Sequence, residues 1–354
     1  MSLFDSSTIT MKHDNNFDAL RLLGASVVVI SHEFALSGRA EPMLLGLKLG
    51  TVGVLIFFAI SGFLVTASWS EDRNLQRFFA RRLLRIWPAL AVCVLSCILL
   101  VVLLLVPPED RSAIPGIVKY LLPNFVFAWR DAIFFQSNPY PYINATLWTI
   151  TIEVQCYVVL SILGFIARAR LRLGMVIVSA VCLSIYMRGY QLQGALSTYA
   201  FFQLHDSLNL PIFFLAGSLI YLIPALQTTR ATFVATVAGA ACFLTGFAGL
   251  GWACALPPIV LQIGRMSWPV ARRAARWGDL SYGIYLWGWP VQQVVVLLLQ
   301  PKAPYLLLLA TTIAVLVPLA LCSWHVIEKR CLRLKPRASN SSVRLDLPNH
   351  VASN

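Results

Sequence analysis

Two ionisable side chains, Arg21 and His32, lie within the stretch 17–36, which is otherwise apolar enough to cross a lipid bilayer. Ionisable groups are costly in a membrane and usually mark a functional site. Eleven residues at about 100° each make roughly three helical turns, so both side chains are expected on one helix face, about 16 Å apart along the axis. Such a helix could hold an anion beside its arginine and transfer a proton at its histidine.

A carboxylate, Glu153, is predicted at a similar depth in a second apolar stretch, 147–167. Glu33 follows His32 directly but points about 100° away around the helix, so a carboxylate from a facing helix is the better partner. A histidine oriented by a carboxylate can take a proton from a hydroxyl group near neutral pH. The sequence therefore predicts a pair of His32 and Glu153; a solvated or purely structural histidine is the simpler alternative.

A second set of candidate residues is basic. Arg82 and Arg85 lie three residues apart in an arginine-rich segment, 75–88, which is predicted to form a surface helix on the cytoplasmic side. Residues at this spacing share a helix face, and guanidinium groups held near a membrane suit phosphate and pyrophosphate groups. An ordinary basic anchor for the neighbouring span explains the same charges equally well.

Composition sets the fold class. The chain has 354 residues, of which 58% are hydrophobic and 12% charged, and its apolar runs repeatedly exceed the length of a membrane-spanning helix. An all-α, polytopic membrane bundle of about ten spans is predicted. The expected spans are 17–36, 49–69, 87–106, 147–167, 173–190, 209–226, 231–249, 251–265, 280–299 and 304–326.

The distribution of basic residues orients this bundle. Lysine and arginine gather in alternate connections, a pattern that places those connections and both termini in the cytoplasm and the long segment 107–146 outside. The net charge of +13 is explained by this pattern and by attraction to anionic lipids, so nucleic-acid binding is not expected. One membrane domain, 17–330, is predicted between an N-terminal segment, 1–16, and a disordered tail, 331–354. Neither a metal site nor an oligomeric state is predicted.

Several motifs follow one another in a characteristic order. They are Arg21-x10-His32, the apolar segment 53–64 with Ser61-Gly62-Phe63, the block from Phe78 to Pro88, Leu147-Trp148-Thr149-x3-Glu153, Phe213-Phe214-Leu215-Ala216-Gly217, the segment 280–286 with Tyr282 and Tyr285, and Ile327-Glu328. In this order the chain resembles membrane acyltransferase family 3 from end to end. Many members have a histidine shortly after the Tyr-Leu pair, where this chain has Trp287-Gly288-Trp289-Pro290.

The resemblance implies an integral enzyme of the bacterial inner membrane that moves an acyl group, commonly acetyl, from cytoplasmic acyl-CoA to a hydroxyl of an envelope or exported carbohydrate. Carried over residue by residue, it makes His32 the essential histidine and Arg21 its paired arginine. It also makes Arg82 and Arg85 the essential cytoplasmic arginines, and places Glu153 at the acidic position after the Leu-Trp pair. His32 would either deprotonate the acceptor hydroxyl or carry the acyl group itself.

Three further polar residues, Ser61, Tyr282 and Tyr285, are expected either to line a channel for the donor or simply to pack. The alternative function is a proton-coupled transporter or flippase that uses His32 and Glu153 as a relay. The two halves of the chain show no matching pair of broken spans, which disfavours this alternative. The identities of the acyl chain and of the acceptor sugar stay open.

Overall fold

The computed structural model describes residues 15–105, 112, 114–130, 134–167, 170–191 and 198–336. Most of the predicted terminal segments, residues 1–14 and 337–354, lie outside this part. The long helices are α1 (Phe17–Leu36), α2 (Leu49–Glu71), α3 (Leu75–Leu100), α5 (Leu147–Ala167), α6 (Leu171–Gln191), α7 (Thr198–Leu222), α8 (Thr229–Leu244), α9 (Ala248–Arg265), α11 (Ser281–Leu299) and α12 (Tyr305–Cys322). Shorter elements are the hairpin β1 (Met43–Leu44) and β2 (Leu47–Lys48), η1 (Val101–Leu105), α4 (Ile114–Leu121), η3 (Leu122–Val126), η5 (Pro224–Gln227), α10 (Pro269–Arg272), η6 (Arg273–Ala275), η7 (Ser323–Glu328) and α13 (Lys329–Leu332). The predicted all-α class is confirmed.

Each predicted span falls on one of the long helices, but these helices differ in length and apolarity. Six segments in the described part are long and apolar enough to cross a membrane: α1, α2, α5, α11, α3 continued to Leu103, and α12 continued to Leu332. The apolar parts of α6, α7 and α8 are shorter than a full span, and α9 carries two prolines and an arginine. Six membrane-crossing helices are therefore supported by length and composition, and the other four spans stay predictions.

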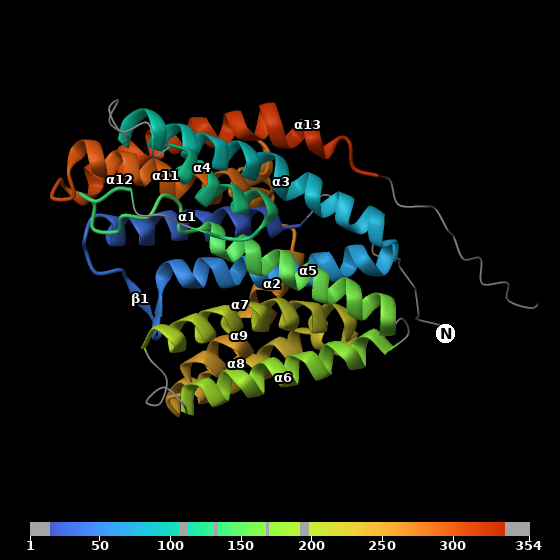
Figure 1. The fold of residues 1–354 in the computed structure, drawn as a ribbon. Helices are drawn as coiled ribbons and strands as arrows, with labels where there is room; N and C mark the ends of the chain where they lie inside the picture. Colours follow the sequence, from blue (N-terminus) through green and yellow to red (C-terminus); the bar gives the residue numbers. More distant parts are fainter. Residues whose placement is uncertain are drawn as a thin grey trace, which may run out of the picture.

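The long helices lie side by side in a bundle with α1 and α2 near its centre (Figure 1). Helix α1 packs against α2 on one side and α11 on the other, and α2 also packs against α7. Helices α11, α12 and α3 form the upper part of the view, and α6 to α9 form the lower part. The helices that carry the candidate site residues, α1, α2, α3, α5 and α11, therefore gather around the middle of the bundle.

Two glycines allow α2 and α7 to approach closely. A Cβ atom at Gly62 would lie 1.9 Å from the carbonyl oxygen of Phe214, and one at Gly217 would lie 2.2 Å from that of Ala59. No side chain fits at either position, and small residues at helix contacts are a usual device of membrane bundles. The glycines of the Ser-Gly-Phe and Phe-Phe-Leu-Ala-Gly motifs thus fix the position of α2, on which Ser61 lies.

Helix α3 revises the prediction of a surface helix that leads into the third span. The arginine-rich segment and the third span form one helix from Leu75, and Pro88 lies inside it. Asn74 caps its start by accepting a hydrogen bond from the backbone N–H of Arg77, 2.9 Å away. Hydrogen bonds from Arg77 and Arg81 hold the pKa of Asp72 far below its usual range, so this carboxylate is charged and clamps the first turns. The arginines that follow face into the bundle instead of extending over its surface.

Candidate active site

His32 lies near the end of α1 and lines a cavity of about 930 Å³, called here the histidine cavity. The chain between α3 and α5, predicted to face outward, supplies part of its wall. Aromatic and polar side chains predominate in the lining: Glu41, Lys48, Trp129, Arg130, Tyr140, Tyr142, Trp148, Asn209, Tyr285 and Trp289. Aromatic walls with a few placed polar groups are typical of small-molecule binding sites.

The ring of His32 is positioned by Trp289. The two rings meet edge to face, with centroids 5.0 Å apart and planes at 78°. Trp289 is itself held in place because its Nε1 donates a hydrogen bond to the carbonyl oxygen of Tyr142 at 3.0 Å. Sequence reasoning had no ground to single out Trp289, because a tryptophan in an apolar span is usually a packing residue.

Glu33, next to His32 in the sequence, anchors α1 to two other helices. Its Oε2 accepts hydrogen bonds from Nε2 of Gln292 in α11 at 2.8 Å and from Oγ1 of Thr312 in α12 at 2.9 Å. As expected from helix geometry, Glu33 points away from its neighbour. Fixing this side of α1 against α11 and α12 turns His32 toward the cavity.

The charged groups that face His32 come from the loop and hairpin that follow α1. Glu41 and Lys48 both lie within electrostatic reach of the imidazole. They form an ion pair of 2.7 Å, and the second carboxylate oxygen of Glu41 accepts a hydrogen bond from Ser31 at 2.9 Å. Glu41 is therefore the carboxylate held beside His32.

Glu153 lies elsewhere, so the predicted pair of His32 and Glu153 is not formed. Its Oε1 accepts hydrogen bonds from Ser61 at 2.6 Å and from Tyr157 at 2.5 Å. Helix α5 packs against α2, α6 and α7, whereas α1 packs against α2 and α11, so the two side chains do not face one another. Similar depth along two helices did not make them neighbours.

Glu153 belongs to a second cavity of about 110 Å³, called here the arginine cavity. Except for His32, every residue predicted for the site lines this cavity: Arg21, Ser61, Arg82, Arg85, Glu153, Tyr282 and Tyr285. The prediction that Arg21 and His32 serve opposite ends of one helix agrees with this arrangement, because each lines a different cavity.

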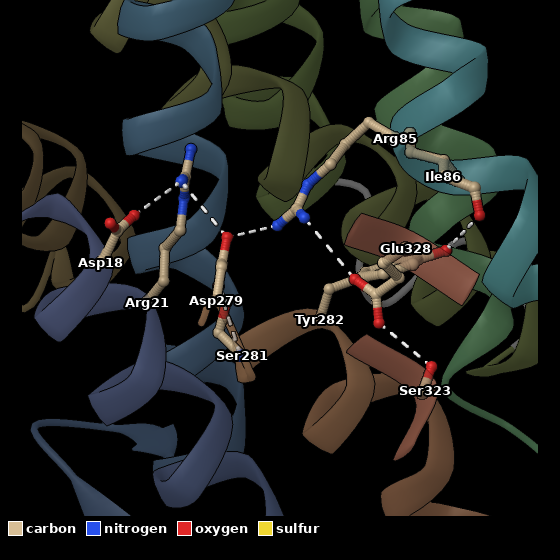
Figure 2. Close-up of polar contacts among 9 residues, drawn as sticks. All are labelled: Asp18, Arg21, Arg85, Ile86, Asp279, Ser281, Tyr282, Ser323 and Glu328. Carbon is tan, nitrogen blue, oxygen red and sulfur yellow. Dashed lines mark hydrogen bonds and ion pairs between the residues drawn. The ribbon is translucent and has the colours of Figure 1, made fainter. Parts of the chain in front are cut away.

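Arg21 and Arg85 share one carboxylate, Asp279, which precedes α11 (Figure 2). Arg85 donates a hydrogen bond to Asp279 and forms an ion pair of 3.5 Å with Glu328, whose exposed fraction is 2%. Burial alone would raise the pKa of Asp279, but the two guanidiniums and the hydrogen bonds from Ser281 outweigh it and hold that pKa below its usual range. This network joins α1, α3, the start of α11 and η7.

The guanidinium of Arg82 has fewer hydrogen bonds and ion pairs than that of Arg85. Its hydrogen bond in the described structure is a long one of 3.4 Å to Ser68, and its buried Nε has no partner there. Glu153 and Tyr157 are the acidic groups within its electrostatic reach. Of the two arginines predicted to bind phosphate, Arg82 is the one with donors to spare, and Arg85 is already paired.

Three residues, Val54, Thr149 and Tyr285, line both cavities and form the partition between them. A hydrogen bond of 2.5 Å between the hydroxyls of Thr149 and Tyr285 closes this partition. Tyr285 was expected to line a channel or to pack, and it lines both the arginine cavity and the cavity that contains His32. Within the described residues, no three histidine, cysteine or acidic side chains are grouped to hold a metal ion.

Comparison with known families decides the class of this site. An acyltransferase domain, family 3, matches residues 14–325, which is nearly the whole chain. The chain belongs to acyltransferase family 3. It is therefore an enzyme that transfers an acyl group, and the transporter alternative is not favoured.

Relatives of this acyltransferase share its length or extend beyond it. The O-acetyl transferase of Shigella phage Sf6 is 30% identical over 93% of this chain and 99% of its own. The putative membrane-bound transacylase BcsY of Komagataeibacter xylinus is 26% identical over 91% of this chain and 84% of its own. The peptidoglycan O-acetyltransferase OatA of Listeria monocytogenes is 25% identical over 90% of this chain, which spans only 55% of OatA. No solved structure matches the chain significantly.

The acyltransferase has functional candidates that sequence reasoning missed, chiefly Asp279 and Glu41. Both lie in connections between apolar stretches, where acidic residues are ordinarily solvated. For Asp279 a signal was available, because it is the one acidic residue in the basic connection 265–279. Glu41 carried no comparable signal in the sequence.

Proposed function

We propose that this acyltransferase moves an acetyl group from acetyl-CoA, bound from the cytoplasm at the arginine cavity, to a hydroxyl of a carbohydrate in the histidine cavity. The observation that carries the proposal is the shared partition of Thr149 and Tyr285, with a guanidinium cluster on one side and His32 on the other. Cationic groups suit the phosphates of a nucleotide carrier. The aromatic rings of the larger cavity offer flat faces for sugar rings, and its polar groups offer partners for hydroxyls.

In the proposed reaction, the pantetheine arm of acetyl-CoA passes the partition and brings the thioester toward His32. The phosphates of the donor stay on the side of the arginines. The imidazole takes the proton of the sugar hydroxyl, whose oxygen attacks the thioester carbonyl carbon. The carbon–sulfur bond then breaks, the ester forms, and the CoA thiolate leaves and accepts a proton. Transfer of the acetyl group first to the imidazole nitrogen is the second route that this geometry allows.

We assign the two sides from the basic connections, whose charge supports a cytoplasmic arginine cavity in an enzyme of the inner membrane. The names of two relatives support a carbohydrate acceptor, since OatA is a peptidoglycan O-acetyltransferase and YrhL of Bacillus subtilis a putative one. The acceptor of the present enzyme is accordingly proposed to be a polysaccharide, a lipid-linked sugar or an oligosaccharide.

Inverted membrane vesicles test this function. Vesicles with the enzyme are incubated with acetyl-labelled acetyl-CoA and total envelope glycans, and label is counted in the glycan fraction beside vesicles without the enzyme. Label that depends on the enzyme and is released by mild alkali supports O-acetyl transfer. Glycan movement across the membrane without label, even with longer acyl-CoAs and native cell extract, would contradict it and favour the transporter.

The two carboxylates are expected to differ in their kinetic roles. Glu41→Gln should lower kcat for acetyl transfer about tenfold, because Glu41 faces the imidazole, and should leave the KM for acetyl-CoA unchanged. Glu153→Gln should mainly raise the donor KM, because Glu153 lies in the arginine cavity with Arg82. Steady-state kinetics with acetyl-CoA as the varied substrate measures both effects. The reverse pattern would restore Glu153 as the partner of His32.

Opening the partition should uncouple the donor from the acceptor. Tyr285→Phe removes the hydroxyl that bonds to Thr149, so water should reach the thioester and the ratio of free acetate to glycan-bound acetate should rise several-fold. Tyr282→Phe is the matched control, since Tyr282 lines the arginine cavity alone and donates to the carbonyl of Ile86. Equal ratios in the wild type and both variants would contradict a gating partition.

A further inference from the structure

Arg82, which lines the arginine cavity, and its neighbour Arg81 have guanidinium donors whose hydrogen-bonding capacity is not used. Nε and Nη2 of Arg81 and Nε of Arg82 are buried and have no partner among the described residues. The remaining Arg81 donor, Nη1, binds Asp72 at 2.8 Å, and the exposed fraction of the Arg81 side chain is only 12%. Leaving charged donors buried and unpaired is costly, so these groups indicate a place for an anionic acceptor.

A further cation reaches the same place from the end of the described chain. After α13, which packs against α3, successive turn hydrogen bonds continue the backbone as far as Lys335. The Lys335 side chain is partly buried and lies within electrostatic reach of Arg81, Arg82 and Arg85 of α3 and Arg21 of α1. Burial, followed by the repulsion of these four guanidiniums, lowers the pKa of Lys335 to about 8.

No carboxylate within the described chain forms an ion pair with Lys335, and the carboxylates beside these guanidiniums are paired with them. Asp72 binds Arg77 and Arg81, and Asp279 binds Arg85. Lys335 thus adds a positive charge beside four guanidiniums and has no ion-pair partner of its own among the described residues. Five cations that repel one another gain most from a ligand with several negative charges.

The size of the arginine cavity limits what can enter it. Its volume of about 110 Å³ is well below the several hundred Å³ of a typical drug-sized ligand pocket, so it can hold a thin arm but not a nucleotide. If the donor is acetyl-CoA, its nucleotide and phosphates must lie outside the cavity, at the entrance.

We propose that Lys335, together with Arg81 and Arg82, binds a phosphate group of the donor nucleotide at this entrance. The inference rests on the proposed function and adds to it a phosphate-binding residue from the C-terminal segment. The shared chemistry is that of a phosphate dianion, which a lipid headgroup could also supply, so the experiment distinguishes these two sources.

The test compares Lys335→Gln with Arg333→Gln, an exposed residue of the same segment, in the full-length enzyme. The donors are acetyl-CoA and S-acetylpantetheine, which keeps the thioester arm but lacks every phosphate. Lys335→Gln should raise the KM for acetyl-CoA roughly tenfold, the effect of one lost charge-assisted contact, with kcat unchanged. Its KM for S-acetylpantetheine should equal that of the wild type, and Arg333→Gln should behave as the wild type with both donors.

The pH dependence of the KM for acetyl-CoA distinguishes phosphate binding by Lys335 from a purely structural role of this residue. Because the Lys335 ammonium loses its proton near pH 8, the wild-type KM for acetyl-CoA should rise between pH 7 and pH 9 more steeply than that of Lys335→Gln. The same measurements are made in vesicles of zwitterionic lipid and of anionic lipid. An effect of Lys335→Gln that appears only with anionic lipid would overturn the nucleotide assignment in favour of a lipid headgroup.

The remaining outcomes separate the two levels of the proposal. A wild-type enzyme that transfers acetyl from acetyl-CoA, with Lys335→Gln equal to it at every pH, would overturn the role of Lys335 and leave the proposed function standing. Equal KM changes for acetyl-CoA and S-acetylpantetheine would show a structural effect and also overturn it. A wild-type enzyme that transfers from neither donor would overturn the proposed function and this inference together.

Discussion

Replacing His32 by alanine is expected to lower the rate of acetyl transfer by a factor of about 10² to 10⁴, the usual contribution of a positioned general base. The structure gives a reason to expect a loss of chemistry and not of donor binding. His32 lines the histidine cavity, while all four arginines near the donor entrance lie on the other side of the partition. The donor should therefore still bind to His32→Ala with the wild-type affinity.

The measurement combines label transfer to the glycan with binding of a non-transferable acyl-CoA thioether. His325→Ala is the matched control, because His325 is an exposed histidine in η7 and lines neither cavity. An enzyme that keeps more than a tenth of its activity without His32 would exclude the imidazole as base or carrier. Hydroxylamine-sensitive label on the wild-type protein, absent from His32→Ala, would select the acyl-histidine route over direct transfer.

The helix geometry of α1 was readable from the sequence because it depends on one element alone. The spacing of Arg21 and His32 predicted that both side chains lie on one face of the helix, near its opposite ends. In the structure they line two cavities that share a wall. The position of Glu153 depended on which helices pack together, and depth along an axis carries no information about that. Packing of α5 against α2 and α7 brought its carboxylate to Ser61 instead of His32.

Connections between helices were the main source of unpredicted site residues. A search for charges inside apolar stretches finds Arg21, His32 and Glu153, but it passes over Asp279 and Glu41, which fold back against the bundle from loops. Such loops have no periodicity, so their positions are set only once the helices have packed. The same holds for the long segment before α5, whose rings complete the histidine cavity.

The two arginines of the α3 motif, predicted to share one role, should separate when each is replaced by glutamine. Arg85→Gln leaves the buried Glu328 without its cation and Asp279 with Arg21 alone, and breaking such a pair costs about 3–5 kcal/mol when it is well buried. Arg82→Gln loses one long hydrogen bond and relieves repulsion among the neighbouring cations. We therefore expect Arg85→Gln to lower the melting temperature of the detergent-purified enzyme by several degrees, and Arg82→Gln to leave it nearly unchanged.

Donor affinity should show the opposite order. Arg82 lines the arginine cavity with an unpaired Nε, so its removal should weaken acyl-CoA binding at least tenfold. The donors of Arg85 already bind two carboxylates, so replacing Arg85 should affect donor binding less. Adding Asp279→Asn and Glu328→Gln to Arg85→Gln should recover part of the lost melting temperature, because no unpaired charge is then left buried. A stable Arg85→Gln enzyme that fails to bind the donor would instead mean that the phosphates displace Asp279 and Glu328 from Arg85. In that case the network of Figure 2 would be a resting state of the donor site and not its scaffold.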